Sequence, residues 1–191
     1  MYLVIDCETT GLPKDRRAPI RDVDNWPRVI QLAWALYDDE GLCDETATMA
    51  CLIRPDGFVV PDDVQRIHGI TTERALSEGK DIAEVLRSLA LTAAKAKVLV
   101  AHSLEFDVKV ISAEYLRAGL EPPFGGKKQI CTMLQSAEFY GVKGKYGFKW
   151  PKLSQLHMKL FGSDFDEAHD ARADVAACAR CFFALKKLGV I

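Results

Sequence analysis

Hydrophobic positions along the chain change from strand-like runs to helix-like periods, and their order predicts a fold class. An apolar run over residues 2–6 predicts a short buried strand. Longer runs over 28–39 and 43–55, joined by the turn Asp39-Glu40-Gly41, have the pattern of a hairpin. Beyond the hairpin, helical spacing alternates with strand-like runs. We therefore expect an α/β fold with a mixed central sheet flanked by helices.

The second half of the chain supplies the alternating elements. Asp81 and Ser103 each stand where a helix cap is expected, directly before residues with helical spacing. The predicted elements are helices over 82–96 and 104–118, strands over 97–102 and 129–131, and helices over 154–160 and 170–188. Residues 13–27 are polar and contain several prolines, which predicts a loop. No repeat or linker divides residues 1–191, so we expect a single domain.

Composition places the chain among ordinary globular proteins. It has 191 residues, of which 49% are hydrophobic and 27% are charged. No apolar run reaches the roughly 18 residues of a membrane span, and the N-terminus lacks the pattern of a signal peptide. We expect a soluble, cytoplasmic protein without a membrane partner. The six cysteines are scattered among apolar neighbours, which favours buried free thiols over disulfides or a zinc site.

The charge distribution is uneven. A net charge of −2 and a pI of about 6.1 argue against a protein that coats nucleic acid, but not against one that grips a chain end. Residues 125–161 contain seven lysines and one acid, Glu138. Within 140–152 the lysines alternate with aromatic residues, a composition that fits single-strand binding and fits a solvated loop equally well. For Trp150 we favour packing beneath the following helix.

Two acids stand at the end of the first predicted strand. Asp6 and Glu8 are separated by one residue, so both side chains project to the same face of the strand and can converge on one cation. Carboxylate oxygens suit Mg²⁺ or Mn²⁺. Such a pair alone is weak evidence, because most paired acids are solvated surface residues.

Three further residues extend this pattern. Asp107 falls in the first turns of a helix that follows a strand, and Asp174 falls in the early turns of the last helix. His169 precedes that helix, and a histidine side chain can take a proton from water. Each has an ordinary structural explanation by itself. Together the acids and the histidine match the chemistry of two-metal phosphodiester hydrolysis.

Three ordered motifs then identify a family. Acid-x-acid followed by Thr and Gly appears over residues 6–12 (DCETTGL), His-x-x-x-Phe-Asp over 102–107 (HSLEFD), and His-x-Ala-x-x-Asp over 169–174 (HDARAD). A secondary signature, His-Gly-Ile-Thr, stands at 68–71. In these motifs the chain resembles the DEDDh family of 3′→5′ exonucleases, and the resemblance covers nearly its whole length.

The resemblance implies a ribonuclease H-like fold and removal of mononucleotides from the 3′ ends of single-stranded DNA or RNA. It implies that two divalent ions, Mg²⁺ or Mn²⁺, bind to four acids: Asp6, Glu8, Asp107 and Asp174. His169 would be the general base. A homodimer and a polymerase or repair partner are both compatible with it. The alternative is an inactive nucleic-acid-binding module with the same fold, against which the complete set of acids argues.

The resemblance also implies residues that contact the substrate. The backbone at Thr9 and Thr10 is expected to bind the terminal sugar hydroxyl. Leu12 and Phe106 are expected to stack or wedge against the last bases. A pocket wall is expected from His68 and Ile70, which could equally cap a structural turn. Ser103 stands where the family usually has asparagine, so we expect altered support of the site or altered substrate contact, with metal binding retained.

Overall fold

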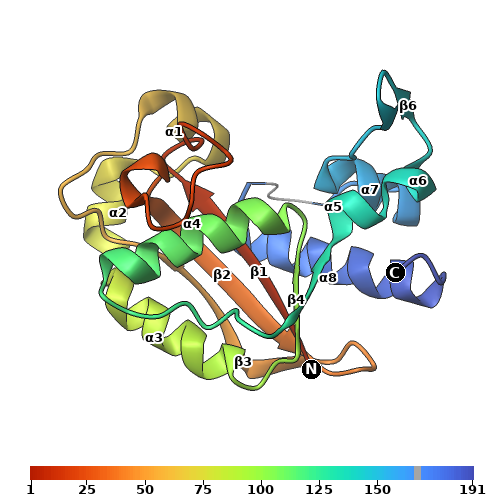
Figure 1. Cartoon of the computed structure of the whole chain (residues 1–191), viewed down its shortest axis with the longest axis horizontal. Helices are drawn as coiled ribbons and strands as arrows, with labels where there is room; N and C mark the ends of the chain where they lie inside the picture. The colour runs from red at the N-terminus through yellow and green to blue at the C-terminus, as the bar shows by residue number, and fades with distance from the viewer. Residues whose placement is uncertain (166–168) are drawn as a thin grey trace.

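A computed structural model describes residues 1–165 and 169–191 of the chain. Its centre is a five-stranded sheet with the order β3-β2-β1-β4-β5 (Figure 1). The strands are β1 (Tyr2–Thr9), β2 (Val29–Tyr37), β3 (Cys43–Leu52), β4 (Val98–Ala101) and β5 (Lys128–Cys131). β1 pairs antiparallel with β2 and parallel with β4. The expected mixed sheet is confirmed, with β1 at its centre.

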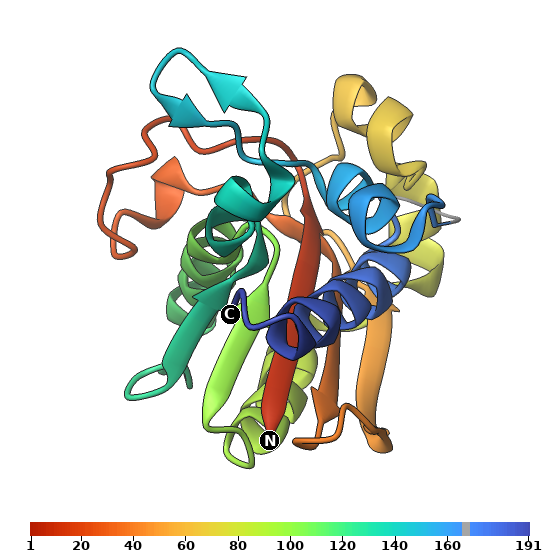
Figure 2. The ribbon, with the colours of Figure 1, turned by 90° about the vertical axis from the view of Figure 1, so that its right-hand side faces the viewer.

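Helices cover both faces of this sheet, as Figure 2 shows. On one face lie α3 (Ile82–Ala93) and α4 (Leu104–Arg117), which pack in one hydrophobic cluster with Leu3 and Ile5. On the other face α8 (Ala171–Lys187) packs against Val4. Successive residues of β1 point to opposite faces, so an apolar run without alternation is what a strand between two helical layers requires. Figure 2 places α8 along β1, and α7 (Leu153–Phe161) packs beside α8.

The remaining elements surround one end of the sheet. They are η1 (Val23–Asn25), α1 (Asp62–His68), α2 (Thr72–Glu78), α5 (Thr132–Gln135), α6 (Ala137–Tyr140), β6 (Lys143–Gly144) and β7 (Gly147–Phe148). β6 and β7 pair as a separate hairpin that projects from the body of the molecule (Figures 1 and 2). The predicted helices end within a few residues of those observed, whereas α1, α2 and the hairpin were not predicted. Among the described residues, no helix is long and apolar enough to cross a membrane.

Candidate active site

The site is built at the C-terminal end of β1. Asp6 and Glu8 project to the face that α8 covers, as their spacing predicts, while Cys7 between them is buried against the α4 layer. The pairing of Glu8 with Gln31 on β2 is followed by a shift of register, after which Thr9, the last residue of β1, pairs with Val29. β1 thus ends one residue after Glu8, so both acids lie near the rim of the sheet.

Asp107 reaches the same rim from the opposite layer. It lies in the first turn of α4 and is 3% exposed. The Cys7 thiol donates a hydrogen bond to Asp107 Oδ1 at 3.4 Å, which ties the helix to the central strand. The backbone N–H of Asp107 is satisfied by the Ser103 carbonyl at 3.3 Å. A short β4 that passes directly into α4 therefore places a helical acid beside the strand acids.

Asp174 lies in the last helix, α8, and its position depends on how that helix begins. Asp170 caps α8 by accepting hydrogen bonds from the N–H groups of Arg172 and Ala173. Gln31 on β2 clamps this start: its Nε2 donates to Asp170 Oδ2 at 2.8 Å and its Oε1 accepts from the Ala171 N–H at 2.9 Å. The cap positions Asp174 one turn into α8, facing β1.

His169 precedes this cap in an unusual conformation. Its φ is +72°, a left-handed backbone value that non-glycine residues seldom adopt. Its N–H donates to Asp174 Oδ2 at 3.2 Å, so the turn is held by an acid of the site itself. Ligand atoms of Glu8, His169 and Asp174 all lie within 4.8 Å of one another. The structure thus brings the predicted histidine to the predicted acids.

The four carboxyls strongly disfavour simultaneous ionisation. Burial, followed by the charge of Asp107 and the other acids, raises the pKa of Asp6 well above its usual range. Burial and the charge of Asp174 raise the pKa of Glu8 to about 8. Burial raises the pKa of Asp107 to about 7 and that of Asp174 to about 6. Burial is the largest cause for each of the four acids, and repulsion from the neighbouring carboxyls adds to it.

These acids have no basic partner in the described part of the chain. The ion pairs there involve Glu78, Glu105 and Glu114, and none of them includes a carboxylate of the site. Clustered carboxylate oxygens without a lysine or arginine are a donor set suited to hard divalent cations. The residues therefore fit the two metal ions that the resemblance implies.

A second histidine supports the site from behind. His102, at the end of β4, has Nε2 2.9 Å from the Pro151 carbonyl and Nδ1 2.9 Å from the Thr132 hydroxyl. A carbonyl can only accept, so Nε2 carries the proton and Nδ1 accepts from Thr132. Burial lowers the pKa of His102 to about 4. A neutral imidazole thus ties the second motif to the segment that follows the β6–β7 hairpin.

Comparison with known proteins settles the family. The sequence profile of the RNase_T family, described as exonucleases, matches residues 3–182. The chain belongs to the RNase_T exonuclease family. This confirms the resemblance to DEDDh-type 3′→5′ exonucleases and makes the chain a hydrolytic enzyme by family.

Individual relatives agree with this assignment. DNA polymerase III subunit epsilon of Treponema pallidum (strain Nichols) is 28% identical over 181 residues, covering 95% of this chain and 74% of the relative. The crystal structure of E. coli Exonuclease I in complex with a dA16 oligonucleotide superposes with a TM-score of 0.75 at 19% identity, over 97% of this chain and 40% of that one. Its zinc-bound form in a complex with single-stranded DNA superposes with a TM-score of 0.74 at 21% identity.

These structures show that the fold is shared, and the expected ribonuclease H-like architecture is confirmed. The chain spans about 40% of the Exonuclease I chain with which it superposes. The family match over residues 3–182 includes the three motifs at 6–12, 102–107 and 169–174.

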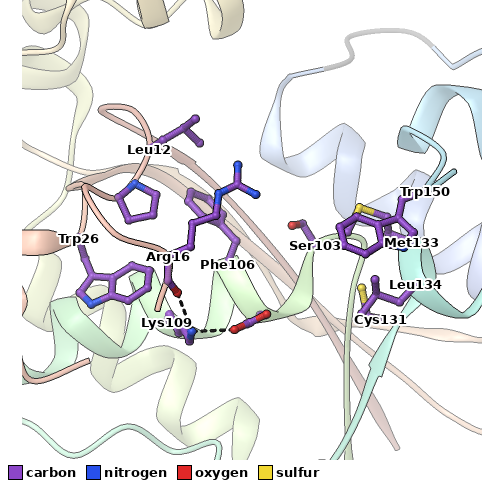
Figure 3. Close-up of a pocket in the computed structure, with 12 residues that line it drawn as sticks. Leu12, Arg16, Trp26, Ser103, Phe106, Lys109, Cys131, Met133, Leu134 and Trp150 are labelled. Carbon is purple, nitrogen blue, oxygen red and sulfur yellow. Dashed lines mark hydrogen bonds and ion pairs between the residues drawn. The ribbon is translucent and has the colours of Figure 1, made fainter. Parts of the chain in front are cut away.

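Next to the acids, the RNase_T exonuclease domain has a largely apolar cavity of about 330 Å³ (Figure 3). Leu12 and Phe106, the expected wedge residues, both line it, and Leu12 is 70% exposed. Ser103 lines it as well, and its side chain forms no capping hydrogen bond although the residue occupies the N-cap position of α4. The predicted serine cap is therefore wrong. Ser103 lines the cavity instead.

Other predicted substrate residues serve the fold. Ile70 is 2% exposed and packs with Ile30 and Val60, so it cannot wall a substrate pocket. His68 instead turns the chain, because its Nδ1 accepts a hydrogen bond from the Ile70 N–H. Burial and the nearby His169 lower the pKa of His68, which places His68 on the α1 side of the site. The structural-turn interpretation thus fits His68, which also lies near His169, while Ile70 belongs to the core.

The turn after β1 is occupied by internal hydrogen bonds. The Thr9 hydroxyl bonds the Gly11 carbonyl at 2.7 Å. The Thr10 N–H donates to the Arg28 carbonyl, and the Thr10 hydroxyl accepts from the Arg28 N–H, both at 2.9 Å. The Thr10 amide is therefore unavailable to a sugar hydroxyl, contrary to expectation, and the role of Thr9 stays a prediction.

Two contributors were missed at the level of sequence. Gln31 is a buried polar residue in the apolar run of β2, and that interruption was the available signal. Trp150 is 62% exposed and lines the cavity, so the expectation that it packs under α7 is wrong. Proline and lysine neighbours give no periodic pattern from which its exposure could have been inferred.

Proposed function

We propose that this domain removes nucleotides from the 3′ end of a single strand, using two divalent ions held by Asp6, Glu8, Asp107 and Asp174. The observation that supports this most directly is the convergence of four acids from both helical layers on one rim of the sheet, with raised pKa values and no basic partner in the described residues. Such a cluster opposes folding unless a cation offsets its charge.

The protein groups divide the work between them. The carboxylates hold the ions, and when bound the ions supply positive charge that offsets the charge developing on the scissile phosphate and the leaving oxygen. His169 lies within 4.8 Å of Glu8 and Asp174, at the exposed side of the cluster, where an attacking water has access. A histidine there takes the proton from water at Nδ1 or Nε2 as the new phosphorus–oxygen bond forms. The products are a nucleoside monophosphate and a strand one nucleotide shorter.

Single-stranded DNA is the substrate we favour. The relative in Treponema pallidum is a DNA polymerase subunit, and the superposed Exonuclease I structures contain DNA oligonucleotides. RNA shares every group that the acids would contact, so the 2′-hydroxyl remains the distinguishing feature. A polymerase partner is proposed on the same relative. Co-elution of purified chain and polymerase subunit in gel filtration would test it, and the same experiment on the chain alone would test the predicted homodimer.

The activity is tested with 5′-labelled strands in Mg²⁺ or Mn²⁺. Single-stranded DNA, single-stranded RNA and duplexes with recessed or overhanging 3′ ends are compared. We expect a ladder that shortens one nucleotide at a time from the 3′ end, fastest on single-stranded DNA. Cleavage of a circular strand would contradict the exonuclease assignment, because a circle has no 3′ end.

The role of the acids is tested by Asp6→Asn. Loss of one ligand should lower the rate by at least about 1000-fold. The neutral amide of asparagine lacks the negative charge with which the carboxylate would hold a divalent cation. Asp63→Asn, an exposed acid on α1, is the control and should retain the wild-type rate. Equal rates for Asp6→Asn and wild type, or full activity in excess chelator, would show that the acid cluster is not the catalytic centre and would favour a binding module.

A further inference from the structure

The β6–β7 hairpin has a composition unlike the rest of the molecule. Residues 141–152 contain four lysines and no acid, although the whole chain has a net charge of −2. Lys143 and Lys149 are exposed, as are the aromatic residues Tyr146, Phe148 and Trp150. Exposed aromatic rings are costly in water, and their combination with lysines is the composition of a surface that binds bases and phosphates.

Trp150 at the base of this hairpin forms one wall of the cavity described above. In Figure 3 the ring stands across the cavity from Leu12 and Arg16, with Phe106 between them. Arg16 is exposed and extends toward the cavity, so the wall opposite Trp150 is also positively charged. At about 330 Å³, the cavity is at the small end of ligand sites and suits one planar group.

The cavity lies beside the start of α4, the helix that carries Asp107. Phe106, which lines it, directly precedes Asp107, and Ser103 lines it from the same turn of α4. On the other side of the acids, His68 of α1 borders the site through its proximity to His169. An exonuclease needs room for one nucleotide on one side of the scissile phosphate and a path for the remaining strand on the other. The Trp150 side has Arg16 in the cavity lining and the exposed hairpin lysines close by in the chain, so it is the side that fits the strand.

The wall is also held in place. Pro151, next to Trp150, is buried, and its carbonyl accepts the hydrogen bond from His102 Nε2 at 2.9 Å. Thr132 fixes the same imidazole at 2.9 Å. Trp150 is therefore anchored through the backbone to the end of β4, while its ring remains free to contact a ligand. A rigid aromatic platform loses little conformational entropy when a base stacks on it.

We propose that Trp150 is the stacking platform for the base on the 5′ side of the scissile phosphate, with Arg16 and the hairpin lysines facing the adjoining backbone. This inference rests on the proposed exonuclease function and adds to it a strand path specific to this hairpin. A protein partner docked on Trp150 is the alternative occupant. Arg16 in the lining and the exposed lysines of the hairpin next to Trp150 favour a polyanion over an apolar protein segment.

The test removes either the ring or the base. Affinities are measured by fluorescence anisotropy in the Asp6→Asn background, which prevents cleavage, for a labelled oligothymidylate and for the same strand with an abasic second position from the 3′ end. In this background with Trp150 intact, loss of that base should weaken binding about 10-fold, the scale of one stacked base. With Trp150→Ala added, the same loss should change affinity less than about twofold, because the stacking partner is already gone.

Two further variants separate stacking from general damage. Trp150→Phe keeps an aromatic ring and should restore most of the sensitivity to the missing base. Tyr146→Ala removes a 91% exposed ring from the same hairpin that does not line the cavity, and it should retain the full 10-fold sensitivity. Equal sensitivity with Trp150 and with Ala at that position would overturn the inference.

The outcomes distinguish the two proposals. If the binding data show a base stacked on Trp150 but the protein cuts no strand in Mg²⁺ or Mn²⁺, the proposed activity is refuted and the stacking role of Trp150 is retained. Stepwise cutting from the 3′ end, combined with a base sensitivity that ignores Trp150, would leave the activity standing and refute the platform. Unchanged strand affinity in Trp150→Ala would also refute it and point to a protein partner at this wall.

Discussion

Replacing Asp107 by asparagine should stabilise the protein in the absence of metal. Burial raises the pKa of Asp107 from its ordinary 3.8 to about 7. A protein that contains an acid with a raised folded-state pKa becomes less stable as pH rises. Between the pKa of the acid in the unfolded chain and its pKa in the folded protein, the folded protein binds more protons than the unfolded chain. The difference corresponds to about 4 kcal/mol at pH 8, where the carboxyl is ionised in both states. Asparagine remains a buried polar group, so we expect a net gain of about 2 kcal/mol.

The assay is thermal unfolding in excess chelator at pH 8 and pH 5. For a chain of this size, a gain of 2 kcal/mol raises the melting temperature by roughly 4–8 °C. At pH 5 the folded carboxyl is protonated in wild type, so the advantage of asparagine should fall to less than half. Added Mn²⁺ should then stabilise wild type more than Asp107→Asn, because binding to the folded state alone raises its stability.

Two results would refute this reasoning. A melting temperature for Asp107→Asn at or below that of wild type at pH 8 would show that the ionised carboxylate does not destabilise the folded protein. An equal gain at pH 5 and pH 8 would show that the gain does not come from ionisation. Asp63→Asn, an exposed acid, is the control and should shift the melting temperature by less than about 1 °C at either pH.

Two other predictions concern the scaffold. His102 has a pKa lowered to about 4 by burial, so its contribution to stability is complete above the ordinary value of 6.5 and is lost as pH falls toward 4, by at most about 3 kcal/mol. His102→Gln should remove this component from the acid limb of a melting-temperature profile. Glu114 is buried between Arg28 and Arg117 at 2.9 Å from each. Glu114→Ala should cost about 3–5 kcal/mol in urea unfolding, because two guanidinium groups lose their partner, and a loss below about 1 kcal/mol would contradict this.

The sheet and the acids were accessible from the sequence for a physical reason. β1 and β2 lie between helical layers and are paired on both edges, so each shows a continuous apolar run, short in β1 and long in β2. Asp6 and Glu8 became identifiable as site residues through the order of the motifs. The acid pair ends a strand, a further acid follows in a helix after another strand, and a histidine precedes the last helix. The motif order therefore predicted the residues that the structure brings together.

The elements that were not predicted lack such a pattern. No residue of α1 is buried, so α1 has no apolar face for periodicity to reveal. The hairpin strands are two residues each, and Phe148 is exposed where a core strand would bury it. Ser103 was assigned as a helix cap from local preference, and Thr10 was assigned to the substrate from the resemblance. The first instead lines the cavity, and the second is hydrogen-bonded to Arg28. The conformation of short, exposed elements, and the role of a residue that could serve either the fold or the substrate, depend on tertiary contacts.

The distribution of the acids along the chain affects when the enzyme can act during its synthesis. Asp6 and Asp174 lie 168 positions apart, and the start of α8 is held to β2 by Gln31. A growing chain that has released β1 and α4 from the ribosome has three of the four acids but neither Asp174 nor His169. Cleavage must then wait until the last helix has docked. On the proposed function, an emerging chain therefore gains the ability to cut a strand only after residues 169–187 have been made and packed against the sheet.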